Sequence, residues 1–124
     1  MLFGEFVRQK RREKKLSIRE FAGMVGISPV YQSSIETGKR YAPSYELQQR
    51  MVSLFELNAD EQAVFYDLAS ASASEKTVPM DIAAYINSNE PIRALIRAAR
   101  DGKVSEAEIL KLVSKARKKG KANK

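Results

Sequence analysis

The segment from residue 17 to residue 38 constrains the fold most, because it holds two short amphipathic stretches with almost no chain between them. Ser17 and Glu20 have the spacing of a capping box, which predicts the start of a helix. Gly26 predicts its end, since glycine readily adopts the left-handed conformation of a sharp turn. Only Ile27 then precedes Ser28, a good N-cap. The pattern therefore predicts two helices joined by a tight turn, the second running from Pro29 to Thr37.

Helical spacing of apolar residues recurs along the rest of the chain, and no stretch alternates long enough to predict a strand. The predicted fold class is therefore all-α. Besides the two helices above, the expected helices run over or start near Leu2–Lys14, Ser44, Asn58 (boxed with Glu61), Asp81–Ile86, Glu90–Arg100 and Ser105 (boxed with Glu108).

These helices fall into two groups separated by a linker. Residues 1–69 are expected to form a five-helix bundle, residues 70–78 a Ser/Ala-rich linker, and residues 79–124 a helical appendage with a basic tail. The side chains expected to face inward in the bundle are Phe6, Val7, Ile18, Phe21, Ala22, Val25, Leu47, Met51, Leu54, Phe55, Val64, Phe65 and Leu68. The appendage carries two apolar stripes, one of Ile92, Leu95, Ile96 and Ala99, the other of Ile109, Leu112, Val113 and Ala116.

The composition excludes many kinds of site. The 124 residues include no Cys and no His, which removes disulfides, Cys/His zinc sites and the commonest nucleophile and general base of enzymes. No spacing of carboxylates matches a catalytic pair or a calcium loop, so we expect no enzyme activity, no metal and no cofactor. No signal peptide or membrane-spanning run is recognisable, and we expect a cytoplasmic protein without a membrane partner.

The net charge of +7 is unevenly distributed along the chain. It amounts to +5 over residues 1–50, −6 over residues 51–90 and +8 over residues 91–124. A basic first segment suits a polyanion such as DNA, because neutralised phosphates release counterions and so favour binding. A solvated surface that only aids solubility explains the charge alone equally well.

Two helices joined by a turn at residues 26–28 form a helix-turn-helix, a motif whose second helix enters the DNA major groove. Residues 6–57 resemble the Cro and lambda-repressor (XRE) family of helix-turn-helix proteins. The residues that carry the resemblance are Phe6–Arg11, Leu16–Ser17, Phe21–Ser28, Tyr31, Ile35–Arg40 and Pro43–Ser44. The resemblance implies a lambda-repressor-like five-helix bundle that binds double-stranded DNA.

The resemblance also assigns two structural roles. Arg11 and Glu36 are implied to form a partly buried ion pair between the first and third helices. Ala22 is implied to be the small residue at which the two helices of the motif pack closely.

An angular step of 100° per residue places Pro29, Val30, Ser33 and Ser34 on one face of the third helix. The resemblance implies that these four positions contact base edges. They lack the Gln, Arg or Asn that many relatives carry there, so bidentate bonds to bases are unavailable and we predict weak direct readout. Specificity would then depend on DNA shape or on side chains outside this helix. Gln32, where relatives usually carry an aliphatic residue, is expected at the edge of the core with its amide in water.

Candidates for phosphate contact surround this helix. They are Ser28, Lys39, Arg40 and Arg19, with Arg8 as an outer candidate. Lys39 and Arg40 also fit a simpler role, because cations near a helix C-terminus complement its dipole.

The leading interpretation is a sequence-specific DNA-binding transcriptional regulator, most simply a repressor that binds an operator as a homodimer. The alternative is a protein-interaction module, such as an antitoxin, anti-repressor or phage-type inhibitor, that binds a partner through residues 79–124 or through the acidic stretch Glu56–Glu75. The appendage stripes suit either an ordinary core or an interface. The basic tail, Lys115–Lys124, suits either a disordered solvated end or auxiliary phosphate binding.

Overall fold

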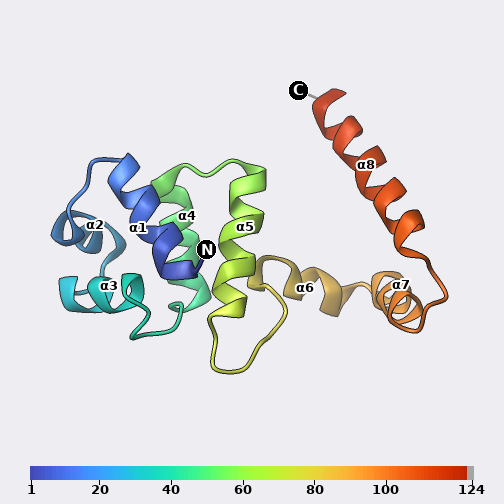
Figure 1. Cartoon of the computed structure of the whole chain (residues 1–124), viewed down its shortest axis with the longest axis horizontal. Helices are drawn as coiled ribbons and strands as arrows, with labels where there is room; N and C mark the ends of the chain where they lie inside the picture. The colour runs from blue at the N-terminus through green and yellow to red at the C-terminus, as the bar shows by residue number, and fades with distance from the viewer. Residues whose placement is uncertain (123–124) are drawn as a thin grey trace. The chain divides into compact units, whose positions relative to one another are not determined.

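A computed structural model gives the fold, and it describes the backbone of residues 1–122 and the side chains of residues 1–120. The described chain is all helical, with no strand among these residues. It divides into two compact units, residues 1–83 and residues 84–124. Figure 1 labels the helices in chain order. None of the described helices is long and apolar enough to cross a lipid bilayer.

The first unit is a bundle built from five helices (Figure 1). They are α1 (Phe3–Glu13), α2 (Ile18–Val25), α3 (Pro29–Glu36), α4 (Tyr45–Phe55) and α5 (Ala59–Ala71). The expected helices are all present, because their start signals are satisfied locally. The Ser17, Ser28, Ser44 and Asn58 side chains each accept a hydrogen bond from the backbone N–H three residues later.

The turn between α2 and α3 forms as the sequence predicts. Gly26 adopts φ +92°, and the N–H groups of Gly26 and Ile27 both donate to the Ala22 carbonyl, at 2.9 and 3.0 Å. Because both N–H groups bond to the same carbonyl, α2 ends sharply at Gly26. Ser28 then caps α3, and Pro29 occupies the first helical position, where its missing N–H costs nothing.

Aromatic side chains from distant parts of the chain form the core. Phe65 of α5 lies edge-on to Phe3 and Phe6 of α1, with ring centroids 5.1 and 6.1 Å apart. Phe21 of α2 stacks on Phe55 of α4 at 4.7 Å. These contacts join α1 to α5 and α2 to α4, so they fix the arrangement that a helix-by-helix prediction leaves open.

Two expectations about side chains in this unit are wrong. Val64 was expected inward but is 47% exposed, because α5 turns Phe65, Tyr66 and Ala69 toward the core instead. Gln32 was expected at the core edge with its amide in water but is completely buried. The reason is local geometry, since Gln32 lies one helical turn before the buried Glu36 and donates to its carboxylate.

The predicted linker, residues 70–78, begins with the last two residues of α5. Its remaining residues also belong to the first unit, and two hydrogen bonds hold this segment. Ser72 accepts a hydrogen bond from the Ala42 N–H at 3.4 Å, and Ser70 donates to the Thr77 carbonyl. Helix α6 (Met80–Ser88) follows, and the boundary between the two units falls within it.

The second unit contains α7 (Glu90–Arg100) and α8 (Glu106–Ala122). Both start where the sequence predicts, with Asn89 and Ser105 as capping side chains. None of the side chains described in residues 84–120 is buried, so this unit has no core of its own. Apolar residues such as Ile96, Leu112 and Val113 stand exposed.

The interpretation of Lys115–Lys124 as a disordered end is wrong for most of its length. Helix α8 continues to Ala122, while residues 123–124 lie outside the described part of the chain. Lys, Arg and Ala are good helix formers, and cations near a helix C-terminus complement its dipole. Continuation of the helix is therefore the physically favoured outcome.

Candidate nucleic-acid interface

Helix α3 presents two different faces. Ile35 and Glu36 are buried against the rest of the bundle, whereas Pro29 is exposed and Val30 is 76% exposed. Ser33 and Ser34 lie between these extremes, partly exposed. The structure thus brings the four predicted base-contacting residues together on the outer side of α3, where an exposed Val can lie against a DNA groove.

The buried face of α3 is held by an ion pair. Arg11 of α1 donates twice to Glu36, from Nε to Oε2 and from Nη2 to Oε1, both at 2.8 Å. Its Nη1 also donates to the Leu16 carbonyl at 2.8 Å. A fork of this kind sets both position and orientation, because two parallel bonds define a plane. It therefore fixes how α3 sits on α1.

Two more side chains lie against the Glu36 carboxylate. Gln32 Nε2 lies 2.7 Å from Oε2, and Arg8 Nε lies 3.5 Å from Oε1. Burial alone would raise the pKa of the Glu36 carboxyl, but the bonds from Arg11 and Gln32 outweigh it and hold that pKa below its usual value. The Glu36 bond likewise outweighs desolvation and raises the pKa of Arg11. Both groups remain charged at neutral pH.

Gln32 completes this network at a cost. Its Nε2 is bonded to Glu36, but its Oε1 is buried and has no hydrogen-bond partner among the described residues. An unpaired buried acceptor costs free energy, on the order of 1 to 3 kcal/mol. The gain is a third hydrogen bond to a carboxylate that water does not reach.

A close approach of α1 and α3 depends on Gly4, which the sequence reasoning missed. A Cβ atom at Gly4 would lie 2.5 Å from the carbonyl oxygens of both Ile35 and Glu36. Real atoms do not come that close, so only glycine allows this packing. The signal in the sequence is a glycine inside a helix, where it is otherwise unfavourable.

Arg50 is a second residue that sequence reasoning missed. From α4, its Nη1 donates to the Val25 carbonyl at the end of α2 at 3.0 Å, while its Nη2 lies 3.1 Å from Glu46. A cation at a helix C-terminus satisfies a free carbonyl and complements the dipole. It thereby ties the turn between α2 and α3 to α4. No local pattern around Arg50 signals this contact.

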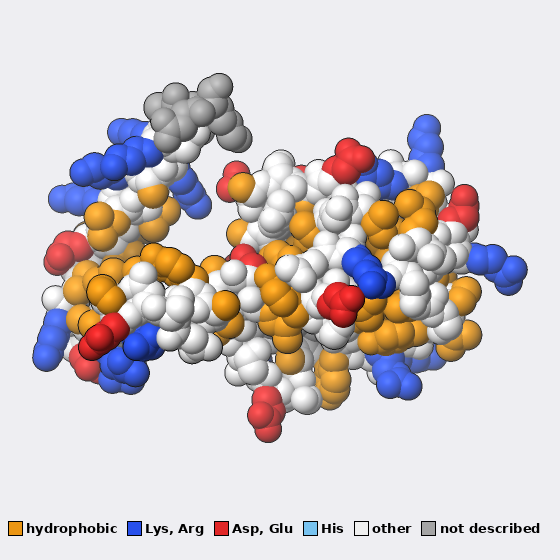
Figure 2. All heavy atoms as spheres, turned by 180° about the vertical axis from the view of Figure 1, so that it is seen from behind, with side chains coloured by type: hydrophobic (Ala, Val, Ile, Leu, Met, Phe, Trp, Pro, Cys, Tyr) orange, Lys and Arg blue, Asp and Glu red, His pale blue; other side chains and the backbone are white. Residues whose placement is uncertain are grey.

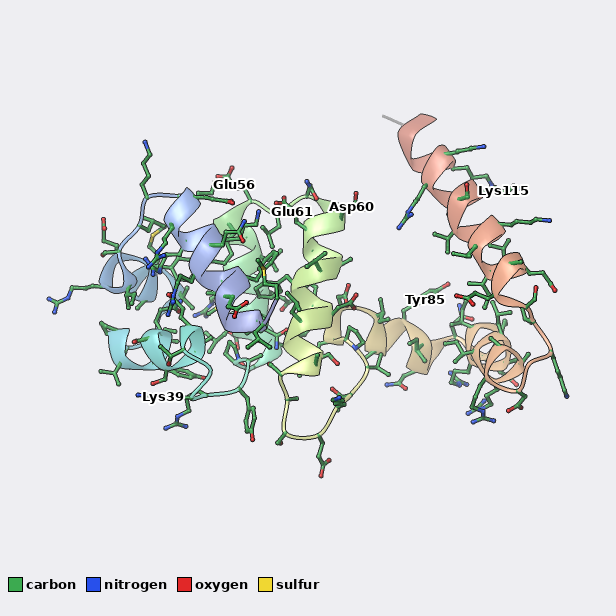
Figure 3. The ribbon with its side chains drawn as sticks, viewed as in Figure 1. Lys39, Glu56, Asp60, Glu61, Tyr85 and Lys115 are labelled. Carbon is green, nitrogen blue, oxygen red and sulfur yellow. The ribbon has the colours of Figure 1, made fainter. Side chains whose placement is uncertain are left out.

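The predicted phosphate-contacting residues lie around α3. Ser28 is exposed at its N-terminus, Arg19 is exposed on α2, and Lys39 and Arg40 follow the C-terminus of α3. Figure 3 labels Lys39 beside α3, with its side chain directed away from the bundle. Arg8 differs from these four, because it is partly engaged by Glu36.

Several other charged side chains of the first unit form ion pairs with one another. Lys10 Nζ lies 2.6 Å from Glu61 Oε2 and 5.6 Å from the centroid of the Phe6 ring. The Glu61 bond is the main cause that raises the pKa of Lys10, and it lowers that of Glu61. Lys14 pairs with Glu56 at 3.4 Å. Figure 3 shows Glu56, Asp60 and Glu61 near the start of α5, so part of the predicted acidic surface is already paired within the chain.

The described residues offer no group of three or more acidic side chains placed to hold a metal ion. The outer face of α3 instead presents two apolar side chains and two hydroxyl groups, with exposed cations nearby.

Comparison with known proteins gives one family match. A family model described as a helix-turn-helix domain matches residues 2–65. A solved structure titled as a complex of a SinR protein and a SinI protein is 19% identical, with 97% of this chain and 99% of that chain covered and a TM-score of 0.46. No curated protein matches the chain. The residues matched by the family model include every candidate contact described above.

Proposed function

The chain belongs to the helix-turn-helix domain family, and we propose that it is a sequence-specific DNA-binding transcriptional regulator, most simply a repressor that binds its operator as a homodimer. The observation that carries the proposal is the two-faced α3. Its inner face is locked to α1 through Arg11 and Glu36, while its outer face exposes Val30. A rigidly held helix with a free outer face can enter a major groove.

The chemistry of the outer face suggests how bases are read. Val30 and Pro29 offer apolar contact to thymine methyl groups, and the hydroxyls of Ser33 and Ser34 can bond to more than one base. No Arg, Asn or Gln points outward from α3 to make a bidentate bond. The proposal therefore includes weak direct readout, with DNA shape and phosphate contacts contributing much of the site preference.

The exposed apolar residues of the second unit support the proposed dimer. The two complete helices of this unit bury no described side chain, yet Ile96, Leu112 and Val113 are exposed on them. Exposed apolar patches mark interaction sites, and in this proposal the occupant is a second copy of the chain. A two-fold dimer also suits DNA, because one helix-turn-helix covers only a half-site. In this proposal the protein acts in the cytoplasm and catalyses no reaction.

The first test is selection from a random duplex pool at near-physiological salt, followed by sequencing of the bound fraction. An enriched inverted repeat, with half-sites about 34 Å apart, supports a dimeric site-specific regulator. A pool that stays flat or becomes merely A/T-biased contradicts site-specific binding.

A matched pair of variants tests which helix reads the DNA. Val30→Ala and Val64→Ala make the same change at exposed valines of the first unit. We expect Val30→Ala to change the enriched sequence and Val64→Ala to leave it unchanged. An unchanged sequence with Val30→Ala would show that the outer face of α3 does not contact bases.

A second pair tests the dimer. Leu112 belongs to the apolar stripe of α8. The equally exposed Leu110 lies outside the stripe, about 160° from Leu112 and about 60° from Val113 at the edge of the stripe. We expect Leu112→Glu to shift the protein from dimer to monomer in analytical ultracentrifugation and Leu110→Glu to leave it dimeric. A monomeric wild type contradicts the homodimer.

The exposed apolar residues of α7 and α8 also favour a second candidate function, a module that binds a different protein. The same variants separate the two. If Leu112→Glu abolishes function in cells while Val30→Ala has no effect, the protein acts mainly through a protein partner.

A further inference from the structure

Helix α8 has an apolar stripe on one side and three lysines on the other side. The apolar stripe consists of Ile109, Leu112, Val113 and Ala116. Lys111, Lys115 and Lys118 fall within about 60° of one another around the axis, centred about 140° from the apolar stripe. We call these three lysines the basic stripe. Two further cations, Arg117 and Lys119, lie beside the apolar stripe, about 40° from Val113 and about 20° from Leu112. Figure 2 shows blue and orange side chains next to one another on α8.

The lysines of the basic stripe form no ion pair within the described part of the second unit. Residues 111–120 contain five Lys or Arg and no Asp or Glu. All of them are exposed, and no carboxylate in the described part of the chain lies within 4.0 Å of their nitrogens. Several cations of the first unit are different, because Lys10, Arg11 and Lys14 each pair with a carboxylate. Figure 3 labels Lys115 on α8, where the basic side chains extend away from the ribbon.

The helix dipole does not account for this charge. Its effect is confined to about the last turn of a helix, which in α8 begins near residue 119. Lys111 and Lys115 lie one to two turns before that. No ion pair within the described part of the second unit offsets their mutual repulsion, so a polyanion is a suitable counter-charge.

The dimensions suit a duplex. Lys111 and Lys118 are seven positions apart, which is about 10 Å along the helix axis. Double-stranded DNA carries one negative charge per about 1.7 Å of its axis, so several phosphates lie within reach of such a stripe.

We propose that the basic stripe of α8 is a second, sequence-independent DNA-binding site that contacts phosphates in addition to those bound around α3. The proposal rests on the proposed function, because it assumes that α3 places the protein on DNA. Because the second unit is covalently joined to the first, the basic stripe then stays at a high local concentration near the duplex. Because the apolar stripe lies on another side of α8, a second copy can cover it and leave the lysines free. A homodimer would carry two such sites.

The test measures DNA binding by the full chain as a function of salt, on the duplex enriched by selection and on an unrelated duplex. The variant is Lys115→Gln/Lys118→Gln, which keeps side-chain length and helix propensity. The matched control is Lys76→Gln/Lys103→Gln, which removes the same charge from exposed positions outside the helices. Circular dichroism of both variants checks that helix content is unchanged.

We expect the α8 variant to reduce the slope of log affinity against log salt concentration by about 2 on both duplexes, and to weaken binding on the order of tenfold near 0.15 M salt. The control should change neither quantity by more than a small part of this. Equal losses in the two variants would overturn the proposal, because net charge alone would then explain the effect. An unchanged slope in the α8 variant would also overturn it.

Two further outcomes keep the hypotheses apart. If the wild type binds both duplexes equally, the proposed site-specific function fails, while the slope still tests the basic stripe. A basic amphipathic helix can also lie on an anionic membrane. Binding to phosphatidylserine vesicles that the α8 variant loses, together with an unchanged DNA slope, would overturn the DNA site in favour of a lipid surface.

Discussion

Arg11 on α1 and Glu36 at the end of α3 are joined by two hydrogen bonds of 2.8 Å, with both side chains almost completely shielded from water. The pair lies between two helices whose separation sets where the outer face of α3 points. A buried charge that loses its partner is strongly destabilising, whereas the pair itself contributes little net stability. Its role is therefore better described as orientation than as a source of stability.

Arg11→Met should lower the free energy of unfolding by about 3 to 5 kcal/mol, because Glu36 is left buried with Gln32 as its nearest donor. Urea denaturation measures this loss. In the double variant Arg11→Met/Glu36→Leu the loss should be smaller than the sum of the two single losses, since no unpaired charge remains. Additive losses would show that the two side chains do not interact.

Gly4→Ala should lower the free energy of unfolding by about 1 to 3 kcal/mol, because its methyl group would lie 2.5 Å from two carbonyl oxygens of α3. Gly23→Ala is the matched control within α2. No described atom lies within 4 Å of a Cβ at Gly23, so this variant should gain about 0.5 to 1 kcal/mol. Thermal melts of the two proteins should shift in opposite directions. Shifts in the same direction would contradict the close packing at Gly4.

The protein should be more stable with glycine at position 15, because Lys15 adopts the left-handed conformation with φ +58°. Lys15→Gly removes that strain and should raise the free energy of unfolding by up to about 1 kcal/mol. The neighbouring Lys14 has φ −82°, so Lys14→Gly should instead lose about 0.5 to 1 kcal/mol. Chemical denaturation of both variants checks the sign, and a loss in Lys15→Gly would contradict the prediction.

Lys39→Ala and Ser34→Ala should affect DNA binding in different ways. Loss of a phosphate contact weakens binding to all sequences and reduces the salt slope by about 1, whereas loss of a base contact changes the preference among sites. Binding titrations on the selected duplex and on single-base variants distinguish the two. If both variants lose affinity uniformly, α3 does not read bases.

Stability should fall in acid because the pKa values of Glu36 and Glu61 are lowered in the folded state. A carboxylate with a lowered folded-state pKa stabilises the fold at pH above its unfolded value, near 4.5, and this contribution is lost as pH falls through the folded pKa. We expect the midpoint of urea denaturation to fall between pH 6 and pH 3. Glu61→Gln should flatten part of that dependence, and an identical profile would argue against the bond with Lys10.

The sequence reveals the helices and their ends because the signals act over three or four residues. Ser17, Ser28 and Asn58 cap helices through backbone N–H groups that are close by in the chain, so the contact forms in any fold that contains the helix. The turn at Gly26 is predictable for the same reason. The outer face of α3 also follows from a 100° step, which is why Val30 is found where the helical geometry places it.

Contacts between helices depend on packing that the chain does not encode locally. Lys10 meets Glu61 across 51 positions, and Arg50 meets the end of α2 across 25. Gln32 is buried beside Glu36, one turn later, and donates to the carboxylate that pairs with Arg11. Val64 is exposed because Phe65 and Tyr66 take the inner face of α5. Local spacing thus decides which residues are helical, whereas the close packing of side chains from distant segments decides which faces are buried and which charges remain free.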